Sequence, residues 1–233
     1  MCDTCGCGDP QVVPVEVQER ILARNDARAH HNREHFRTRG VLAVNLMGSP
    51  GAGKTAVLEA TARAYAGRRR LGALAGDLAT DNDARRLSAA GITSLSITTG
   101  SACHLDAEMV HDALHALPAG ELDLLFVENV GNLVCPAVYD LGQALCVVAL
   151  SVTEGEDKPL KYPAMFRTAD LVLLTKTDLL PHLPGYDVGA LEDALARVMP
   201  APTLLRLAAL GGEGVEQWIE WLEARVPQTA VPV

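Results

Sequence analysis

The residues with the clearest chemical meaning form a glycine-rich octapeptide, Gly48-Ser49-Pro50-Gly51-Ala52-Gly53-Lys54-Thr55. A loop of this kind points several backbone N–H groups at one anion, and the helix after it adds the positive end of its dipole. The spacing G-x-x-x-x-G-K-T therefore predicts that this loop, extended to Ala56, binds the phosphates of a nucleoside triphosphate. We expect Lys54 to contact the β and γ phosphates and the Thr55 hydroxyl to ligate Mg²⁺.

Acidic residues follow two of the expected strands. Asp77 follows the segment 71–76, and Glu128 follows the segment 122–127. Ligands of a parallel α/β sheet bind outside the carboxyl ends of its strands, so both carboxylates are expected to hold Mg²⁺, directly or through water. We place Asp77 in the catalytic set with the lysine and threonine of the loop, although a helix N-cap is an equally good interpretation. A purely structural Glu128 is disfavoured, because an unpaired buried carboxylate is costly.

A second nucleotide motif follows the segment 170–175. The residues Thr175-Lys176-Thr177-Asp178 resemble the guanine-specificity motif N-K-x-D, with Thr in place of Asn, a variant also found in GTPases related to the signal-recognition particle. Lys176 and Asp178 are therefore expected to contact the base, with Asp178 accepting from the N–H groups of guanine. Further along, Ala208-Ala209 replaces a Ser-Ala pair found in many GTPases, so a backbone N–H must make any contact there. The motif favours GTP over ATP.

The first seven residues contain three cysteines, Cys2, Cys5 and Cys7, in the spacing C-x-x-C-x-C. Three thiolates leave a four-coordinate ion one ligand short. The candidate fourth ligands are the α-amine of Met1 and the side chains of His30, His31 and His35. Cysteine count alone does not choose between nickel, zinc and copper(I). The alternative interpretation is an oxidisable tail that binds no metal.

Further metal-ligating residues lie between the nucleotide motifs. Cys103-His104 precedes an expected helix, and Cys135 follows Glu128 by seven residues. Both segments leave strand ends near the expected position of the γ-phosphate. Three ligands from one chain suit an ion with an open coordination position, or an ion shared across a symmetric dimer. The alternative is a pair of buried thiols with a helix-capping histidine, and Cys146, inside an apolar segment, is expected to be an ordinary buried thiol.

The composition limits the class of protein. With 233 residues, 48% of them apolar, the chain can bury a full core in one α/β domain with short appendages. A formal charge of -9 disfavours a nucleic-acid partner, because binding to a phosphate backbone depends on clustered Lys and Arg. No apolar run reaches membrane-spanning length and no signal peptide is recognisable, so we expect a cytoplasmic protein without a membrane partner. In that compartment the six cysteines are more consistent with thiols or metal ligands than with disulfides.

The elements that position these residues alternate between helix and strand. Residues 1–37 are interpreted as a flexible, metal-binding, cysteine-rich arm followed by a polar helix, and residues 38–233 as one nucleotide-binding domain. Alternating apolar runs and helical patterns predict a doubly wound, mostly parallel sheet in that domain. The expected strands are 41–47, 71–76, 94–98, 122–127, 145–151, 170–175 and 203–208. The expected helices are 54–66, 82–90, 105–116, 187–198 and 215–225, the last with Trp218 and Trp221 on one side.

Together these motifs resemble the HypB family, GTPases that help insert nickel into [NiFe]-hydrogenase. The motifs that carry the resemblance cover nearly the whole chain, and the last two are the most specific. They are Cys2–Cys7, Gly48–Thr55, Gly76-Asp77-Leu78-Ala79-Thr80, Cys103-His104-Leu105-Asp106-Ala107, Glu128-Asn129-Val130-Gly131-Asn132-Leu133-Val134-Cys135-Pro136 and Glu154-Gly155-Glu156-Asp157-Lys158-Pro159-Leu160-Lys161-Tyr162-Pro163. The histidine-rich stretch of some members is reduced here to His30, His31 and His35, which argues against nickel storage.

The resemblance implies a three-layer α/β P-loop NTPase fold of the SIMIBI class, whose members dimerise with nucleotide. It implies hydrolysis of GTP to GDP, a high-affinity nickel site at the N-terminal cysteines, and a weaker nickel or zinc site at Cys103, His104 and Cys135 in the dimer interface. It also implies two partners, a HypA-type accessory protein and the precursor of the hydrogenase large subunit. The expected function is a GTP-gated transfer of nickel, with slow intrinsic hydrolysis because no arginine finger or water-positioning glutamine is evident.

Other functions remain open from the sequence. A small-molecule phosphotransferase would use the same loop but needs a pocket for the phosphate acceptor. A nickel or zinc buffering protein would use the loop only to stabilise its fold. The urease-maturation GTPase UreG shares the fold implied by the resemblance, but its Cys-Pro-His metal motif is absent because Ala137 follows Cys135-Pro136.

Overall fold

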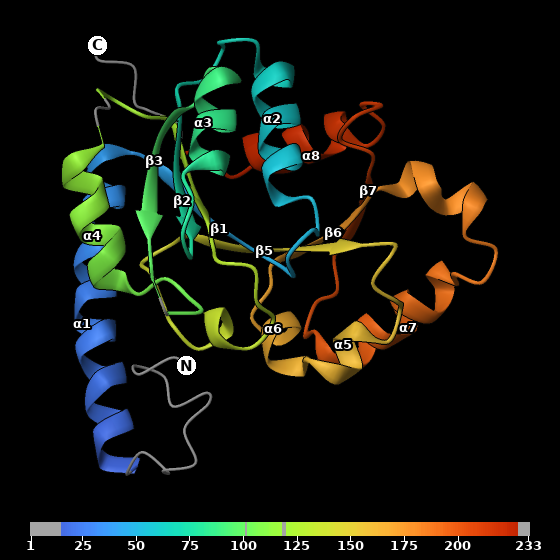
Figure 1. Cartoon of the computed structure of the whole chain (residues 1–233), viewed down its shortest axis with the longest axis horizontal. Coiled ribbons are helices and arrows are strands. Elements are labelled where there is room, and N and C mark those ends of the chain that lie inside the picture. Colours follow the sequence, from blue (N-terminus) through green and yellow to red (C-terminus); the bar gives the residue numbers. More distant parts are fainter. Residues whose placement is uncertain (1–14, 101, 118–119, 228–233) are drawn as a thin grey trace.

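A parallel β-sheet between two layers of helices forms the body of the molecule (Figure 1). The computed structural model describes residues 15–100, 102–117 and 120–227, with side chains from residue 19. The strands are β1 (Leu42–Met47), β2 (Leu71–Asp77), β3 (Thr93–Thr98), β4 (Leu124–Glu128), β5 (Leu145–Ser151), β6 (Leu171–Thr175) and β7 (Leu204–Leu207). Across the sheet their order is β3-β2-β4-β1-β5-β6-β7, and all neighbours are parallel. Each predicted strand is present, and the predicted α/β fold class is confirmed.

The helices are distributed over both sides of this sheet. They are α1 (Val15–Arg39), α2 (Lys54–Tyr65), α3 (Asn82–Ala89), α4 (Ala107–Ala116), α5 (Lys158–Lys161), α6 (Pro163–Arg167), α7 (Val188–Val198) and α8 (Val215–Glu223), with 3-10 turns η1 (Cys135–Ala137) and η2 (Thr177–His182). Helices α2, α3 and α8 cover one side, and α1, α4, α5, α6 and α7 cover the other (Figure 1). The sequence did not predict α5, α6, η1 or η2, because elements of three to six residues are too short to show a helical period.

Strand residues alternate between the two cores, as the pleat of a strand requires. In β1, Val44 and Leu46 pack toward α2 and α8, whereas Ala43 packs toward α4. On the first side the largest fully buried side chain is Trp218, whose Nε1 donates to Thr61 Oγ1 at 2.8 Å. Its ring stacks on Trp221 with the centroids 5.6 Å apart, which confirms that both tryptophans lie on one side of α8.

Helix α1 is polar, yet one stripe of it is buried against α4 and the 140–141 loop. The buried residues Asn25, Ala29, Asn32 and Phe36 recur every three or four positions, so they share one side of the helix. Asn25 Nδ2 donates to the Asp140 carbonyl at 2.8 Å, and Asn25 Oδ1 accepts from the backbone N–H at the start of α4 at 2.9 Å. Amide hydrogen bonds thus replace part of the apolar contact by which a helix usually docks. The domain boundary at residue 37 stays a prediction.

Strand β1 lies between β4 and β5 in the middle of the sheet. Because all strands are parallel, the carboxyl ends of β1, β2, β4 and β6 meet along one edge of the sheet. The loops that carry the predicted site residues leave from this edge. Within the described residues no helix is long and apolar enough to cross a membrane.

Candidate nucleotide and metal site

The glycine-rich loop connects β1 to α2, as predicted. Gly48 and Gly53 have φ values of 148° and 90°, which favour glycine. A side chain at Gly48 would collide with the carbonyl oxygen of Ala149 on the neighbouring strand. Helix α2 begins directly after Gly53, and no side chain caps its first N–H groups. This is the local geometry of an anion-binding loop.

Lys54 lies in the wall of a cavity of about 390 Å³ that the loop shares with β2, α3 and β4. Its side chain is only 8% exposed, and Nζ donates to the carbonyls of Gly48 and Ser49 at 3.3 Å. Burial lowers the pKa of Lys54, while the nearby carboxylates of Glu128, Asp83 and Glu154 oppose that shift. The loop therefore holds its cation at the cavity by two long hydrogen bonds that a phosphate oxygen can replace.

Thr55 joins two carboxyl groups in the same cavity. Its Oγ1 lies 2.7 Å from Glu128 Oε1 and 3.0 Å from Asp83 Oδ1. One hydroxyl proton cannot serve both acceptors. Burial raises the pKa of Glu128 to about 7, so a protonated Glu128 can donate to Thr55 while Thr55 donates to Asp83.

The same three side chains fit a Mg²⁺ ion. They bring a hydroxyl and two carboxyl groups to one point, and Mg²⁺ prefers such oxygen ligands. In the described part of the chain Glu128 Oε2 is buried without a hydrogen-bond partner, although a buried polar atom normally has one. A divalent ion would satisfy that oxygen and remove the need to protonate Glu128.

Asp77 lines the same cavity, but the turn after β2 occupies its carboxylate. Oδ1 accepts from the backbone N–H groups of Ala79 and Thr80 at 2.9 and 3.0 Å, and Oδ2 accepts from Thr80 Oγ1 at 3.2 Å. These hydrogen bonds lower the pKa of Asp77. Asp77 does not cap a helix, since α3 begins later, after Asp81. The direct contact with Thr55 belongs to Asp83, and a role of Asp77 toward Mg²⁺ or in catalysis stays a prediction.

The residues predicted to read the base lie at the end of β6. Lys176 has a left-handed backbone, φ 58°, and begins η2, in which Asp178 is exposed. Thr175 stands where the guanine-specificity motif N-K-x-D has Asn. It is 2% exposed, and its Oγ1 donates to the Ala52 carbonyl at 2.6 Å. The hydroxyl therefore links the base motif to the phosphate loop.

Of the two residues Ala208 and Ala209, only one keeps a backbone N–H as a candidate contact to a base. The Ala208 N–H donates to the Glu213 carbonyl at 2.9 Å. It is therefore already engaged within the chain, which leaves the N–H of Ala209 as the candidate contact to a base.

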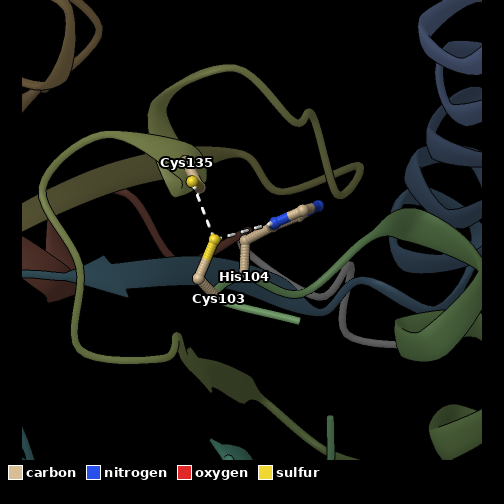
Figure 2. A group of neighbouring side chains, drawn as sticks. All are labelled: Cys103, His104 and Cys135. Atoms are coloured by element: carbon tan, nitrogen blue, oxygen red, sulfur yellow. Dashed lines mark hydrogen bonds between the residues drawn. The ribbon is translucent and has the colours of Figure 1, made fainter. Parts of the chain in front are cut away.

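Cys103, His104 and Cys135 come together from two loops (Figure 2). Cys103 and His104 lie between β3 and α4, and Cys135 begins η1 after β4. The two sulfurs are 2.8 Å apart, Cys103 Sγ is 3.8 Å from His104 Nδ1, and all three ligand atoms lie within 4.8 Å of one another. In the part of the chain that the structure describes, this is the one group of three or more His, Cys, Asp or Glu ligands so close together. The predicted juxtaposition is present, and the chemistry of two thiols and one imidazole suits a borderline divalent ion.

His104 is held in a defined position. It is 4% exposed, and its ring stacks on Tyr139 with a centroid distance of 3.9 Å and an interplanar angle of 23°. Burial lowers the pKa of His104, so the imidazole is neutral at pH 7, as a metal ligand must be. The predicted alternative role as a helix cap is excluded, because Asp106 caps α4 by accepting from Met109 N.

One segment connects this group to the nucleotide cavity. Asn129, next to Glu128, is 1% exposed, and its Oδ1 accepts from the backbone N–H of Leu105 at 3.1 Å. Gly131 packs against Pro50 of the phosphate loop, where an added Cβ would lie 2.9 Å from the proline ring. The next residue, Asn132, pairs with Gly48 in an isolated antiparallel bridge. The chain from β4 to Cys135 thus touches the phosphate loop on its way to the metal-ligating group.

Comparison with known proteins gives a family that fits this arrangement. The model of the family described as CobW/HypB/UreG, nucleotide-binding domain, matches residues 42–205. The hydrogenase maturation factor HypB of Azotobacter vinelandii is 50% identical over 209 residues, which cover 90% of this chain and 69% of that protein. The chain belongs to the HypB family of hydrogenase maturation factors.

Solved HypB structures agree with the fold. The crystal structure of HypB from Archaeoglobus fulgidus has a TM-score of 0.81 and 38% identity, covering 88% of this chain and all of that one. The HypB structure from Helicobacter pylori in complex with nickel has a TM-score of 0.83 and 35% identity, covering 90% of this chain and all of that one. The predicted resemblance to the HypB family is confirmed.

The structure of this HypB-family chain also contains site residues that the sequence analysis missed. Asp83 contacts Thr55, Asn129 bridges the two groups, and Arg86 lines the nucleotide cavity. Arg86 lines this cavity together with residues of the phosphate loop and is paired with Glu59 of α2 at 3.0 Å. The sequence feature that could have indicated Asp83 and Arg86 is the segment after Asp77, where an acid and an arginine recur at helical spacing. The predicted ligands Cys2, Cys5 and Cys7 lie outside the described residues.

Proposed function

We propose that this HypB-family protein is a GTP-dependent nickel metallochaperone, which hydrolyses GTP to gate the delivery of Ni²⁺ to a [NiFe]-hydrogenase precursor. The observation that carries the proposal is the continuous segment from Glu128 to Cys135, which contributes to a nucleotide cavity at one end and to a metal-ligating group at the other. Nickel is the cargo in this proposal. GTP and GDP are the signals that set how tightly it is held.

The phosphate chemistry is assigned to the residues around the cavity. Lys54 and free backbone N–H groups of the loop, which extends from Gly48 to Ala56, bind the phosphates, and Lys176 and Asp178 recognise guanine. Thr55, Asp83 and Glu128 would hold Mg²⁺, with Asp77 placed to act through water. Bound there, the ion offsets the negative charge of the phosphates. Hydrolysis adds water to the γ-phosphorus and breaks its bond to the bridging oxygen, which leaves with the electron pair as GDP.

The metal chemistry is assigned to Cys103, His104 and Cys135. Two thiolates and a neutral imidazole suit Ni²⁺ and also Zn²⁺, so either ion fits the donor set. Three ligands from one chain leave a position open to a second subunit, to a partner protein or to water. A homodimer formed on nucleotide or metal binding would bring two such groups together. The predicted site at Cys2, Cys5 and Cys7 would supply the ion to this group.

The coupling between the two ends follows from the buried contacts. A Mg²⁺ ion at Glu128 would shift the start of the segment that ends at Cys135, and the Asn129 hydrogen bond transmits the shift to Leu105, next to His104. A ligand changes an equilibrium only by its different affinity for two states, so nickel and nucleotide affinities must be linked in both directions. The partners proposed with this cycle are a HypA-type accessory protein and the hydrogenase large-subunit precursor in the cytoplasm, without nucleic acid or membrane.

Phosphate release from GTP in the presence of Mg²⁺ tests the enzymatic half of the proposal. We expect inorganic phosphate and GDP in equal amounts, a slow rate on the order of an unassisted GTPase, and no release by Lys54→Ala. Transfer of the phosphate to an added small molecule in place of water would point to a phosphotransferase. Nickel uptake that responds neither to nucleotide nor to Lys54→Ala would point to a buffering protein.

A further inference from the structure

Four histidines, none of them part of the site described above, lie along the seam between α1 and α4. His31 and His35 are four residues apart on α1, and His111 and His115 are four residues apart on α4, so each pair shares one side of its helix. The ring centroids are 5.0 Å apart for His31 and His111, 6.4 Å for His35 and His115, and 4.6 Å for His111 and His115. The four rings form one continuous group, which we name the histidine seam.

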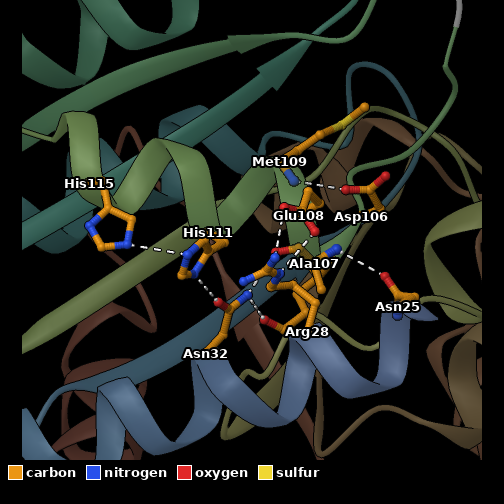
Figure 3. Close-up of polar contacts among 10 residues, drawn as sticks. Asn25, Arg28, Asn32, Asp106, Ala107, Glu108, Met109, His111 and His115 are labelled. Carbon is orange, nitrogen blue, oxygen red and sulfur yellow. Dashed lines mark hydrogen bonds and ion pairs between the residues drawn. The ribbon is translucent and has the colours of Figure 1, made fainter. Parts of the chain in front are cut away.

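Two nitrogen atoms of the histidine seam already lie at the spacing of metal ligands. The Nε2 atoms of His111 and His115 face each other at 3.2 Å (Figure 3). Two imidazole nitrogens bound to one tetrahedral ion at about 2.0–2.1 Å are separated by about 3.3 Å. The pair on α4 therefore needs little rearrangement to chelate an ion.

Asn32 sets the tautomer of His111. The amide of Asn32 is buried, and its Nδ2 donates to the carbonyls of Ala107 and Leu141 at 2.8 and 3.1 Å. Its Oδ1 must then be the atom that faces His111 Nδ1 at 3.1 Å, and an oxygen without a proton can only accept (Figure 3). His111 Nδ1 therefore carries the proton, and the lone pair is on Nε2. A hydrogen bond to the other ring nitrogen is how proteins commonly orient a metal-binding histidine.

The surroundings keep the histidine seam accessible to solvent. His31 and His115 are exposed, and His35 and His111 are half-buried. Two charged neighbours of His111, Arg28 and Glu108, pair with each other at 2.9 Å. Burial and neighbouring cationic groups lower the pKa of His35 and His111, so both imidazoles can act as ligands at neutral pH.

We propose that the histidine seam is a further transition-metal site, which binds one divalent ion of the nickel and zinc class through imidazole nitrogens alone. His111 and His115 provide the first two ligands. His31 and His35, whose rings contact the α4 pair edge to face, complete the coordination by rotation of their side chains. The site is chemically distinct from the thiolate-containing group at Cys103, because it lacks sulfur. It joins α1 to α4, so an occupied site clamps the N-terminal helix onto the domain.

Equilibrium dialysis against NiCl₂ tests the site in a full-length chain whose Cys2, Cys5, Cys7, Cys103 and Cys135 are changed to Ser. The cysteine substitutions remove the nickel sites of the proposed function, so the two proposals fail independently. We expect this chain to retain about one Ni²⁺, as four imidazoles suffice for one ion. Adding His111→Gln and His115→Gln should abolish retention. His30→Gln, an exposed histidine of the same helix outside the seam, should leave it unchanged.

Retention of no nickel by the cysteine-free chain, or retention that survives the double substitution, would overturn the proposal. Circular dichroism melting of each variant checks that the helices remain folded. If the cysteine-free chain does not fold, Co²⁺ added to the unaltered chain provides the same answer, because thiolate-bound Co²⁺ has a sulfur charge-transfer band and imidazole-bound Co²⁺ has none. The thiolate sites of the unaltered chain give the sulfur band, and the expected result is an additional cobalt absorption that is lost in the His111→Gln, His115→Gln chain while the sulfur band remains. A spectrum that is the same in the two chains contradicts the site.

Discussion

The backbone N–H of Leu105 donates a 3.1 Å hydrogen bond to Asn129 Oδ1 in the buried centre of the molecule. Leu105 adjoins His104 of the metal-ligating group, and Asn129 adjoins Glu128 of the nucleotide cavity. The Asn129 side chain also donates to Asn45 on β1 at 3.2 Å. Both ends of the proposed switch are thus attached to one amide, which cannot move without changing the contacts of both.

Replacing this amide should uncouple the two ends. In Asn129→Ala we expect the nickel affinities of the GTP-analogue and GDP forms to become equal, whereas in the natural chain they should differ by about 5- to 150-fold, the usual range of allosteric coupling. The N–H of Leu105 also loses its buried acceptor, which should cost about 1–3 kcal/mol of stability. Nickel titration followed by isothermal calorimetry measures the first effect, and urea unfolding measures the second.

Asn45→Ser is the matched control for that variant. It removes a neighbouring buried amide of the same network and leaves the hydrogen bond between Asn129 and Leu105 in place. We expect a comparable loss of stability with the coupling retained. Loss of coupling in both variants would attribute the effect to general loosening of the core and would contradict the role of Asn129.

Replacing Asp83 should weaken the Mg²⁺-dependent binding of nucleotide. Its Oδ1 is 3.0 Å from Thr55 Oγ1, so Asp83→Asn removes a charge from the predicted ion site. We expect about a tenfold or greater loss of Mg²⁺-dependent nucleotide affinity, since removing one charged hydrogen-bonding group costs about 1.5–3 kcal/mol. Asp81→Asn, two residues earlier on the exposed start of α3, is the control and should change affinity little. Fluorescence titration with a labelled nucleotide at several Mg²⁺ concentrations compares them.

Binding of Mg²⁺ and nucleotide should strengthen with pH because of Glu128. Burial raises the pKa of this carboxyl to about 7, and a bound cation requires the ionised form. Affinity should therefore rise by up to about tenfold per pH unit below pH 7 and level off above it. In Glu128→Gln this dependence should disappear. A pH series of Mg²⁺-dependent nucleotide binding from pH 6 to 8 measures both chains, and an unchanged slope in the variant would contradict the assignment.

Stability without metal should show the opposite dependence. The folded pKa of Glu128 is raised above its ordinary value of 4.5, so the carboxyl contributes stability that is fully present below pH 4.5 and is lost as the pH rises through about 7. Relative to Glu128→Gln, the natural chain should lose up to about 1.4 kcal/mol per pH unit in that window. Thermal unfolding in the presence of a chelator reports the difference between the two chains.

Thr175→Val tests the link between the base motif and the phosphate loop. The substitution keeps the shape of the side chain and removes the hydroxyl that donates to the Ala52 carbonyl at 2.6 Å. Leaving that buried carbonyl without its donor should cost about 1–3 kcal/mol and weaken binding of GTP and GDP alike. Thr177→Val, two residues later, is the control, because Thr177 Oγ1 has no hydrogen-bond partner among the described residues. Equal effects of the two substitutions on nucleotide affinity would contradict the link.

The sequence was sufficient for the strands and the phosphate loop, because long apolar runs such as β4 and a glycine-rich turn are local signals. It also predicted that Cys103 and Cys135 lie close together, since both follow strands that end at one edge of the sheet. Asp83 was missed because a polar helix start next to Asp81 resembles a solvated surface. The docking of α1 was missed for a related reason, as Asn25 and Asn32 act through amide hydrogen bonds that have no apolar pattern. The role of Asp83 and the docking of α1 both depend on tertiary contacts, which a local sequence pattern does not show.

The coupling between nickel and nucleotide binding is tested by a nickel titration of the protein loaded with a non-hydrolysable GTP analogue, compared with the same titration of the GDP-loaded protein. Light scattering on the same samples records the oligomeric state. We expect nickel dissociation constants that differ by about fivefold or more, together with a change in oligomeric state. Equal affinities and equal oligomeric states in the two nucleotide forms would contradict it.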